Sequence, residues 1–161
     1  MENQSAFTVA PPMAAGAPRP TDPAAPPRRR ILRGIGAVGA GFLTIVVLSL
    51  GTDVALHAAG VFPPWGQTMG DGLFALATAY RILFSIVGCW VAARLAPDRP
   101  LRHALWLGGV GIVVSGAGAV AAATQGPALG PLWYPLALVA VTFPCAWAGG
   151  TLGGRPRPAR G

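Results

Sequence analysis

Four residues with ionisable or hydrogen-bonding side chains interrupt apolar runs and are the candidates for chemistry in this chain. Asp53 and His57 lie near the end of the first apolar run, and Tyr80 and Arg81 lie within the second. Ionisable groups inside membrane spans are costly and are therefore candidates for function. Asp53 and His57 are four residues apart, so they share one face of a helix. An imidazole at this place could exchange protons near neutral pH, and a guanidinium could hold an anionic group.

The spacing of Asp53 and Arg81 predicts that they form an ion pair. Asp53 lies 14 residues before Gln67 and Arg81 lies 14 residues after it, so a hairpin that turns near Gln67 brings them to similar depth. At 1.5 Å per residue, Asp53 would lie roughly 28 Å and Arg81 roughly 20 Å from the side of the membrane at which arginines flank the apolar runs. Side chains on a helix lean toward its N-terminus, and the two helices of a hairpin run in opposite directions. Asp53 and the long Arg81 side chain therefore lean toward each other.

Two interpretations of this cluster follow from the sequence. In the first, the pair only fixes one helix to the next, and His57 faces headgroups and water. In the second, Asp53, His57, Tyr80 and Arg81 line a polar pocket that opens to the outside. The first is favoured because an ion pair satisfies its own members, whereas a binding site leaves polar capacity open.

Motifs for catalysis, metals or cofactors are missing from the sequence. There is no HExxH, GxSxG or Walker A motif, and the GxGxxG spacing at 34–39 follows a basic block rather than a strand. The two cysteines, Cys89 and Cys145, lie in apolar runs without a CxxC or Cys/His pattern. We therefore expect no enzyme activity, no metal and no cofactor.

Composition indicates a membrane protein. Of the 161 residues, 53% are hydrophobic and only 11% are charged, against roughly 25% charged residues in soluble domains. The surplus apolar surface must face lipid. The net charge of +7 arises from arginines that bracket the apolar runs. A nucleic-acid-binding protein would gather them on one folded face, so nucleic acid is not an expected partner.

The apolar runs predict an all-α fold, a bundle of four transmembrane helices. Residues 1–30 read as a disordered, basic tail rich in proline and alanine, and 155–161 as a basic C-terminal tail. The transmembrane domain covers 31–154, with helices at about 34–58, 72–96, 101–124 and 132–153. The basic block at 28–33 resembles an export signal, but the apolar run after it is too long for a cleaved one.

The distribution of arginine predicts the orientation. Ten arginines flank the spans on one side of a four-helix topology, and the other two connectors have none. Because arginine-rich segments stay cytoplasmic, both termini are expected in the cytoplasm. Six aromatic residues fit the two interfaces: Trp65, Trp133, Tyr134, Trp90, Trp106 and Trp147. The ten arginines are Arg28, Arg29, Arg30, Arg33, Arg94, Arg99, Arg102, Arg155, Arg157 and Arg160.

Small residues at four-residue spacing predict how the helices pack, since close backbone approach drives association in lipid. These stripes could seal one bundle or a homo-oligomer, and the first is favoured. Pro144 should place a static kink in the last helix. The stripes are Gly111, Ser115, Ala119 and Ala123; Cys145, Gly149 and Gly153; Ala146, Gly150 and Gly154; and Gly34, Gly36, Gly39 and Gly41.

A longer pattern resembles a group of known sequences. It runs from Thr52-Asp53 and His57 through Pro63-Pro64-Trp65-Gly66 to Tyr80-Arg81, and is followed by Ala-Arg-Leu-Ala-Pro-Asp-Arg-Pro at 93–100. The chain thereby resembles uncharacterised four-span bacterial inner-membrane proteins over residues 31–154. The resemblance implies the topology and no activity.

The sequence thus favours a non-catalytic structural or accessory component of the bacterial inner membrane. Its expected partners are the lipid bilayer and either a second copy or another membrane protein. The alternative is a subunit of a small-solute or proton-coupled transporter or channel; a membrane enzyme is the least favoured. The transporter interpretation would require a polar cavity near the middle of the membrane.

Overall fold

The computed structural model describes residues 27–126 and 130–154, and this part of the chain folds into four helices. They are α1 (Pro27–Ala58), α2 (Asp71–Leu95), α3 (Pro100–Gln125) and α4 (Trp133–Gly153). Each is long and apolar enough to cross a membrane. The predicted all-α, four-span fold is therefore confirmed.

The first helix begins earlier than the sequence predicted. It starts at Pro27 rather than near residue 34, so residues 27–30 belong to α1 and not to a disordered tail. Proline fits the first helical position, where its missing N–H is not needed, and arginine is a good helix former. The predicted tails at 1–26 and 155–161 lie outside the described residues.

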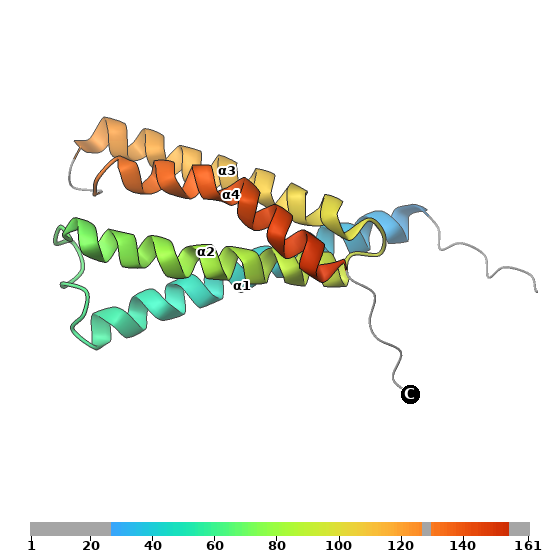
Figure 1. Ribbon diagram of the computed structural model, residues 1–161, viewed down its shortest axis with the longest axis horizontal. Coiled ribbons are helices and arrows are strands. Elements are labelled where there is room, and N and C mark those ends of the chain that lie inside the picture. The colour runs from blue at the N-terminus through green and yellow to red at the C-terminus, as the bar shows by residue number, and fades with distance from the viewer. Residues whose placement is uncertain (1–26, 127–129, 155–161) are drawn as a thin grey trace, which may run out of the picture.

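The helices alternate in direction, so the chain's basic segments gather at one end of the bundle. Figure 1 shows the start of α1, the α2–α3 connection and the end of α4 at one end, and the other two connections at the opposite end. We call these the arginine end and the loop end. Among the described arginines, only Arg81 lies away from the arginine end.

The distribution of large and small residues is inverted relative to a soluble bundle. Leu107 is the one large side chain that is fully buried in the described part of the chain, and the rest of the buried core is mostly alanine and cysteine. Large apolar side chains point outward instead; Val113 is 72% exposed and Leu83 61%. This pattern is expected when lipid covers the outside and small residues allow the helices to approach.

Helix α4 uses its two predicted stripes for two different neighbours. Gly149 and Gly153 pack against α2; a Cβ on Gly153 would lie 2.6 Å from the Cβ of Ala93. Ala146 and Gly150 pack against α3; a Cβ on Gly150 would lie 2.9 Å from the Cβ of Ala104. Both stripes therefore form contacts between helices of the same chain. The helix continues through Pro144.

The other two stripes are used only in part. Gly41 of α1 and Gly88 of α2 form a close crossing, where a Cβ on Gly88 would lie 2.7 Å from the carbonyl oxygen of Gly41. Gly36 and Gly39 have open space beside them. On α3 the prediction was partly wrong: Gly111 packs on Thr142 of α4, but Ala123 is exposed and Ala122 is buried instead.

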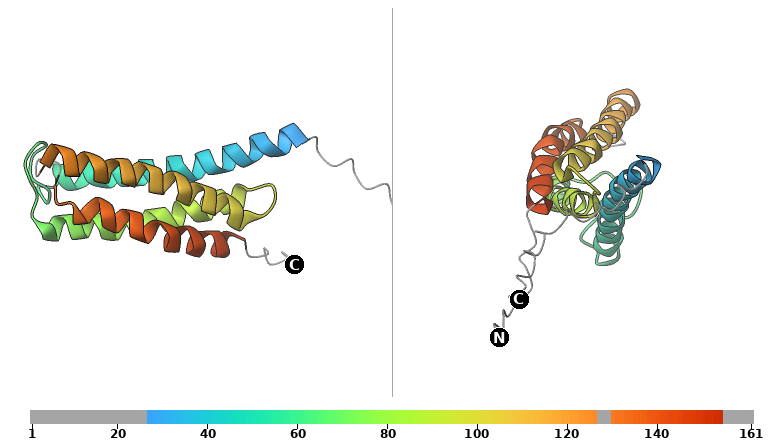
Figure 2. Two further views of the ribbon diagram at one scale, coloured as in Figure 1. Left: turned by 90° about the horizontal axis from the view of Figure 1, so that it is seen from above. Right: turned by 90° about the vertical axis from the view of Figure 1, so that its right-hand side faces the viewer.

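Helix α2 is the centre of the arrangement. It contacts α1, α3 and α4, whereas no Cα atom of α1 lies within 8 Å of a Cα atom of α4 among the described residues. At the loop end α1 lies apart from α3 and α4 (Figure 1), and the view along the bundle shows α1 set apart from α4 (Figure 2). One consequence is a set of cavities between α1 and α3.

Candidate polar site between the first two helices

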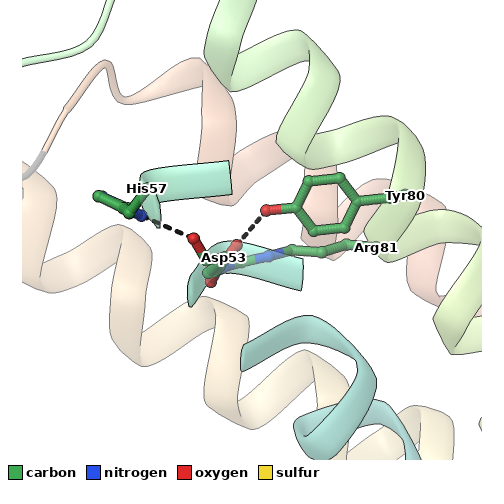
Figure 3. A network of polar contacts seen from close by, with 4 residues as sticks. All are labelled: Asp53, His57, Tyr80 and Arg81. Carbon is green, nitrogen blue, oxygen red and sulfur yellow. Dashed lines mark hydrogen bonds and ion pairs between the residues drawn. The ribbon is translucent and has the colours of Figure 1, made fainter. Parts of the chain in front are cut away.

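The Asp53 carboxylate accepts hydrogen bonds on both of its oxygens from α2. Arg81 donates from Nη2 to Oδ2 at 2.8 Å, which makes an ion pair, and the Tyr80 hydroxyl donates to Oδ1 (Figure 3). The Asp53 side chain is 14% exposed and that of Arg81 31%. The ion pair predicted from the spacing is therefore present, and it is half-buried.

The register of the first hairpin brings these groups together. Asp53 lies five residues before the end of α1, and Arg81 lies ten residues after the start of α2. The difference in depth is spanned by the length of the arginine side chain, which leans toward the start of its helix. Tyr80 precedes Arg81 directly, and its long side chain reaches the second carboxylate oxygen.

His57 does not join the carboxylate, although it lies one helical turn from Asp53. Its Nδ1 lies 2.7 Å from the backbone oxygen of Asp53, and because a carbonyl can only accept, Nδ1 carries the proton of this bond. The ring stacks on Trp65 at 3.8 Å between centroids and meets the edge of Phe62. Of the four residues predicted to cluster, Asp53, Tyr80 and Arg81 form one network, whereas His57 packs against the loop that follows α1.

Arg81 has a further partner that the sequence did not predict. Its guanidinium carbon lies 5.6 Å from the ring centroid of Tyr134 on α4, a distance at which a cation is attracted to the face of an aromatic ring. Arg81 therefore connects three helices. Its Nε atom is buried without a hydrogen-bond partner among the described residues.

A second polar contact joins α2 and α4 at the loop end. The Trp133 Nε1 donates to Asp71 Oδ1 at 3.0 Å. Both residues stand at the first position of their helices, and α2 and α4 run in the same direction (Figure 1). The sequence predicted that Trp133 and Tyr134 mark the interface between membrane and water. Their residue types alone could not show that these two side chains also hold α4 to α2.

The ion pair borders a cavity of about 360 Å³ in the middle part of the bundle. Most of its wall is apolar, with contributions from all four helices. The polar side chains that line it are Ser49, Asp53, Arg81, Ser85, Ser115 and Thr142. No group of three or more metal-binding side chains occurs within residues 27–126 and 130–154.

Replacing Tyr80 with phenylalanine should lower the free energy of unfolding by about 1.5 kcal/mol, because a hydrogen bond to a charged acceptor is lost. The Thr78→Val variant is the matched control, since the Thr78 hydroxyl bonds only to the Phe74 carbonyl of its own helix. Denaturant titration in detergent micelles measures both. Equal losses in the free energy of unfolding would show that the Tyr80 bond to Asp53 adds no more stability than a hydrogen bond within one helix.

Chemically, the site is a network of paired charges in which one donor, Arg81 Nε, has no hydrogen-bond partner among the described residues. The carboxylate accepts one bond on each oxygen, and the arginine charge is balanced by the carboxylate and faced by an aromatic ring. Such a network fixes α1 and α4 to α2. Comparison of the chain with models of protein families, with curated proteins and with solved structures finds no match.

Proposed function

We propose that this protein is a non-catalytic accessory component of the bacterial inner membrane. The observation that carries the proposal is the pairing of Asp53, each of whose two oxygens accepts a hydrogen bond from α2, one from Tyr80 and one from Arg81. A protein that moves protons or binds a solute through this carboxylate would need it to be free for part of the cycle. The network instead serves as a clamp between the first two helices.

The proposal includes an orientation with both termini in the cytoplasm. It is supported by the gathering of Arg28, Arg29, Arg30 and Arg33 with Arg94, Arg99 and Arg102 at one end of the bundle. The connection at residues 59–70 has no arginine or lysine. Short arginine-rich segments are retained on the cytoplasmic side during insertion.

The test is a flux measurement on the purified protein in liposomes. We expect proton and small-ion flux no greater than in protein-free liposomes, both for the natural chain and for Asp53→Asn. Asparagine keeps the shape of the side chain and removes its charge, so it would stop transport that depends on the carboxylate. A flux that is present in the natural chain and lost in Asp53→Asn would overturn the accessory role.

A second candidate is a subunit of a small-solute or proton-coupled transporter or channel. One observation favours it: the one ion pair found among the described residues, Asp53–Arg81, and four hydroxyl side chains line the cavity of about 360 Å³. Transporters bind their substrates near the middle of the membrane, where the polar side chains in this mostly apolar wall could contact a solute. The same flux measurement distinguishes the two candidates.

A further inference from the structure

A second groove runs between α1 and α3 at the arginine end, away from the Asp53 network. Its volume is about 890 Å³, and it is open on one side. The apolar walls include Ile35, Val38 and Phe42 of α1, and Trp106 and Val110 of α3. These residues continue from the end of the bundle toward its middle, so the groove is a strip of apolar surface between two helices.

The mouth of this groove is rich in positive charge. Arg30 from α1 and Arg99 and Arg102 from the start of α3 line it together with His103 and one carboxylate, Asp98. The single ion pair among the described residues is Asp53–Arg81, so Asp98 lies more than 4.0 Å from the charged nitrogens of these arginines. Three guanidinium groups therefore face the mouth without a salt-bridge partner there. Guanidinium groups bind phosphate through two parallel hydrogen bonds.

Arg99 is held in an unusual backbone conformation at this mouth. Its φ angle is 41°, the one positive value at a residue other than glycine in the described chain. A bulky residue is strained there, and such strain persists where the surroundings impose it. The Arg99 carbonyl accepts a bond from the Arg102 backbone N–H at 2.9 Å and one from the His103 ring at 3.4 Å. The turn is thus fixed in the form that places Arg99 at the groove.

We propose that this groove binds an anionic phospholipid. The phosphate lies among Arg30, Arg99 and Arg102, and an acyl chain lies along the apolar wall toward Phe42 and Val110. The length supports this occupant: from Arg30 to Phe42 the helix rises about 18 Å, close to one leaflet of a hydrocarbon core about 30 Å thick. Basic pockets between transmembrane helices suit anionic headgroups with their chains in the bilayer.

The inference is independent of the proposed function, because it rests on neither Asp53 nor the absence of transport. A phospholipid is the occupant that combines a negative group at the level of the arginines with an apolar chain at the level of Phe42 and Val110. A transmembrane helix of a partner or a second copy would fill the apolar wall without supplying the phosphate. Native mass spectrometry distinguishes a bound phospholipid from these other occupants.

The experiment measures retained lipid by native mass spectrometry of the protein in an uncharged detergent. Phosphatidylglycerol and phosphatidylcholine with identical acyl chains are added in turn. We expect phosphatidylglycerol to bind at least about tenfold more tightly, since the arginines attract its net negative charge and phosphatidylcholine carries no net charge. Substituting glutamine for Arg30, Arg99 and Arg102 together should abolish this preference.

The matched control removes the same charge from the same end. Arg28, Arg33 and Arg94 lie at the arginine end but do not line the groove, so their triple glutamine variant should retain the preference. Equal binding of the two lipids to the natural chain, or an equal loss in both triple variants, would overturn the proposal. So would a stable dimer that excludes phosphatidylglycerol.

A second pair of variants tests the acyl chain separately from the headgroup. Gly39 lines the groove and Gly36 does not, and a Cβ at either position would have no atom within 4 Å. Gly39→Leu should therefore fill the groove and lower phosphatidylglycerol binding several-fold, with all arginines intact, while Gly36→Leu should not. An unchanged affinity in Gly39→Leu would contradict binding of the lipid chain in this groove.

Discussion

Gly149→Val should lower the free energy of unfolding by about 3 kcal/mol or more and leave little folded protein. A Cβ at this position would lie 2.5 Å from the Ile86 carbonyl oxygen and 2.9 Å from the Trp90 backbone nitrogen. Overpacking a tight interior typically costs 1–3 kcal/mol, and here two of the opposing atoms belong to the α2 backbone and cannot turn aside. Helix α4 would have to move away from α2.

The chain's two cysteines provide the measurement. Cys89 is 3% exposed and Cys145 4%, so a thiol-reactive fluorophore labels them only when the helices separate. We expect Gly149→Val to be labelled at much lower temperature than the natural protein. Gly109→Val is the control, because a Cβ on Gly109 would have open space around it. Similar labelling temperatures for the two variants would show that the α2–α4 contact tolerates a larger residue.

Arg81→Ala should lower the free energy of unfolding by about 2 kcal/mol. This lies between the 0–1 kcal/mol of an exposed ion pair and the 3–5 kcal/mol that follows when one member of a buried pair is removed. The intermediate value is expected because Asp53 is 14% and Arg81 31% exposed. The variant also loses the contact with the Tyr134 ring.

A double-mutant cycle separates the ion pair from the other contacts. Asp53→Ala and Arg81→Ala together should cost about 1 kcal/mol less than the sum of the single losses, because residues in one network are energetically coupled. Arg94→Ala in place of Arg81→Ala is the control, since Arg94 lies at the arginine end beside Trp90 and should add to Asp53→Ala without coupling. Additive losses for Asp53 and Arg81 would contradict the clamp.

The helices and the ion pair followed from the sequence because both depend on local rules. Helix length and hydropathy determine the spans, and a hairpin with a known turning point determines which residues on its two arms lie at one depth. The side-chain lean of a helix then brings Asp53 and Arg81 together. The stripes of small residues on α4 could likewise be predicted from the sequence, since residues four positions apart lie on one face of a helix.

Contacts that depend on the arrangement of distant segments could not be predicted. His57 stacks on Trp65 because the 59–70 loop folds back over the end of α1, and no periodic pattern describes that loop. The Tyr134 ring meets Arg81 only because α4 packs beside α2. The groove at the arginine end lies between α1 and α3, which are not neighbours in the sequence, so it depends on how both helices pack against α2.

The central place of α2 has a consequence for how the protein is made. Helices enter the bilayer in chain order, and α1 has its main contacts with α2 and few with the later helices. During synthesis α1 must therefore remain alone in lipid until α2 emerges, and the Asp53 carboxylate has no partner during that interval. Arrival of Tyr80 and Arg81 ends it, so the network that holds the mature bundle can join the first two helices before α3 and α4 are made.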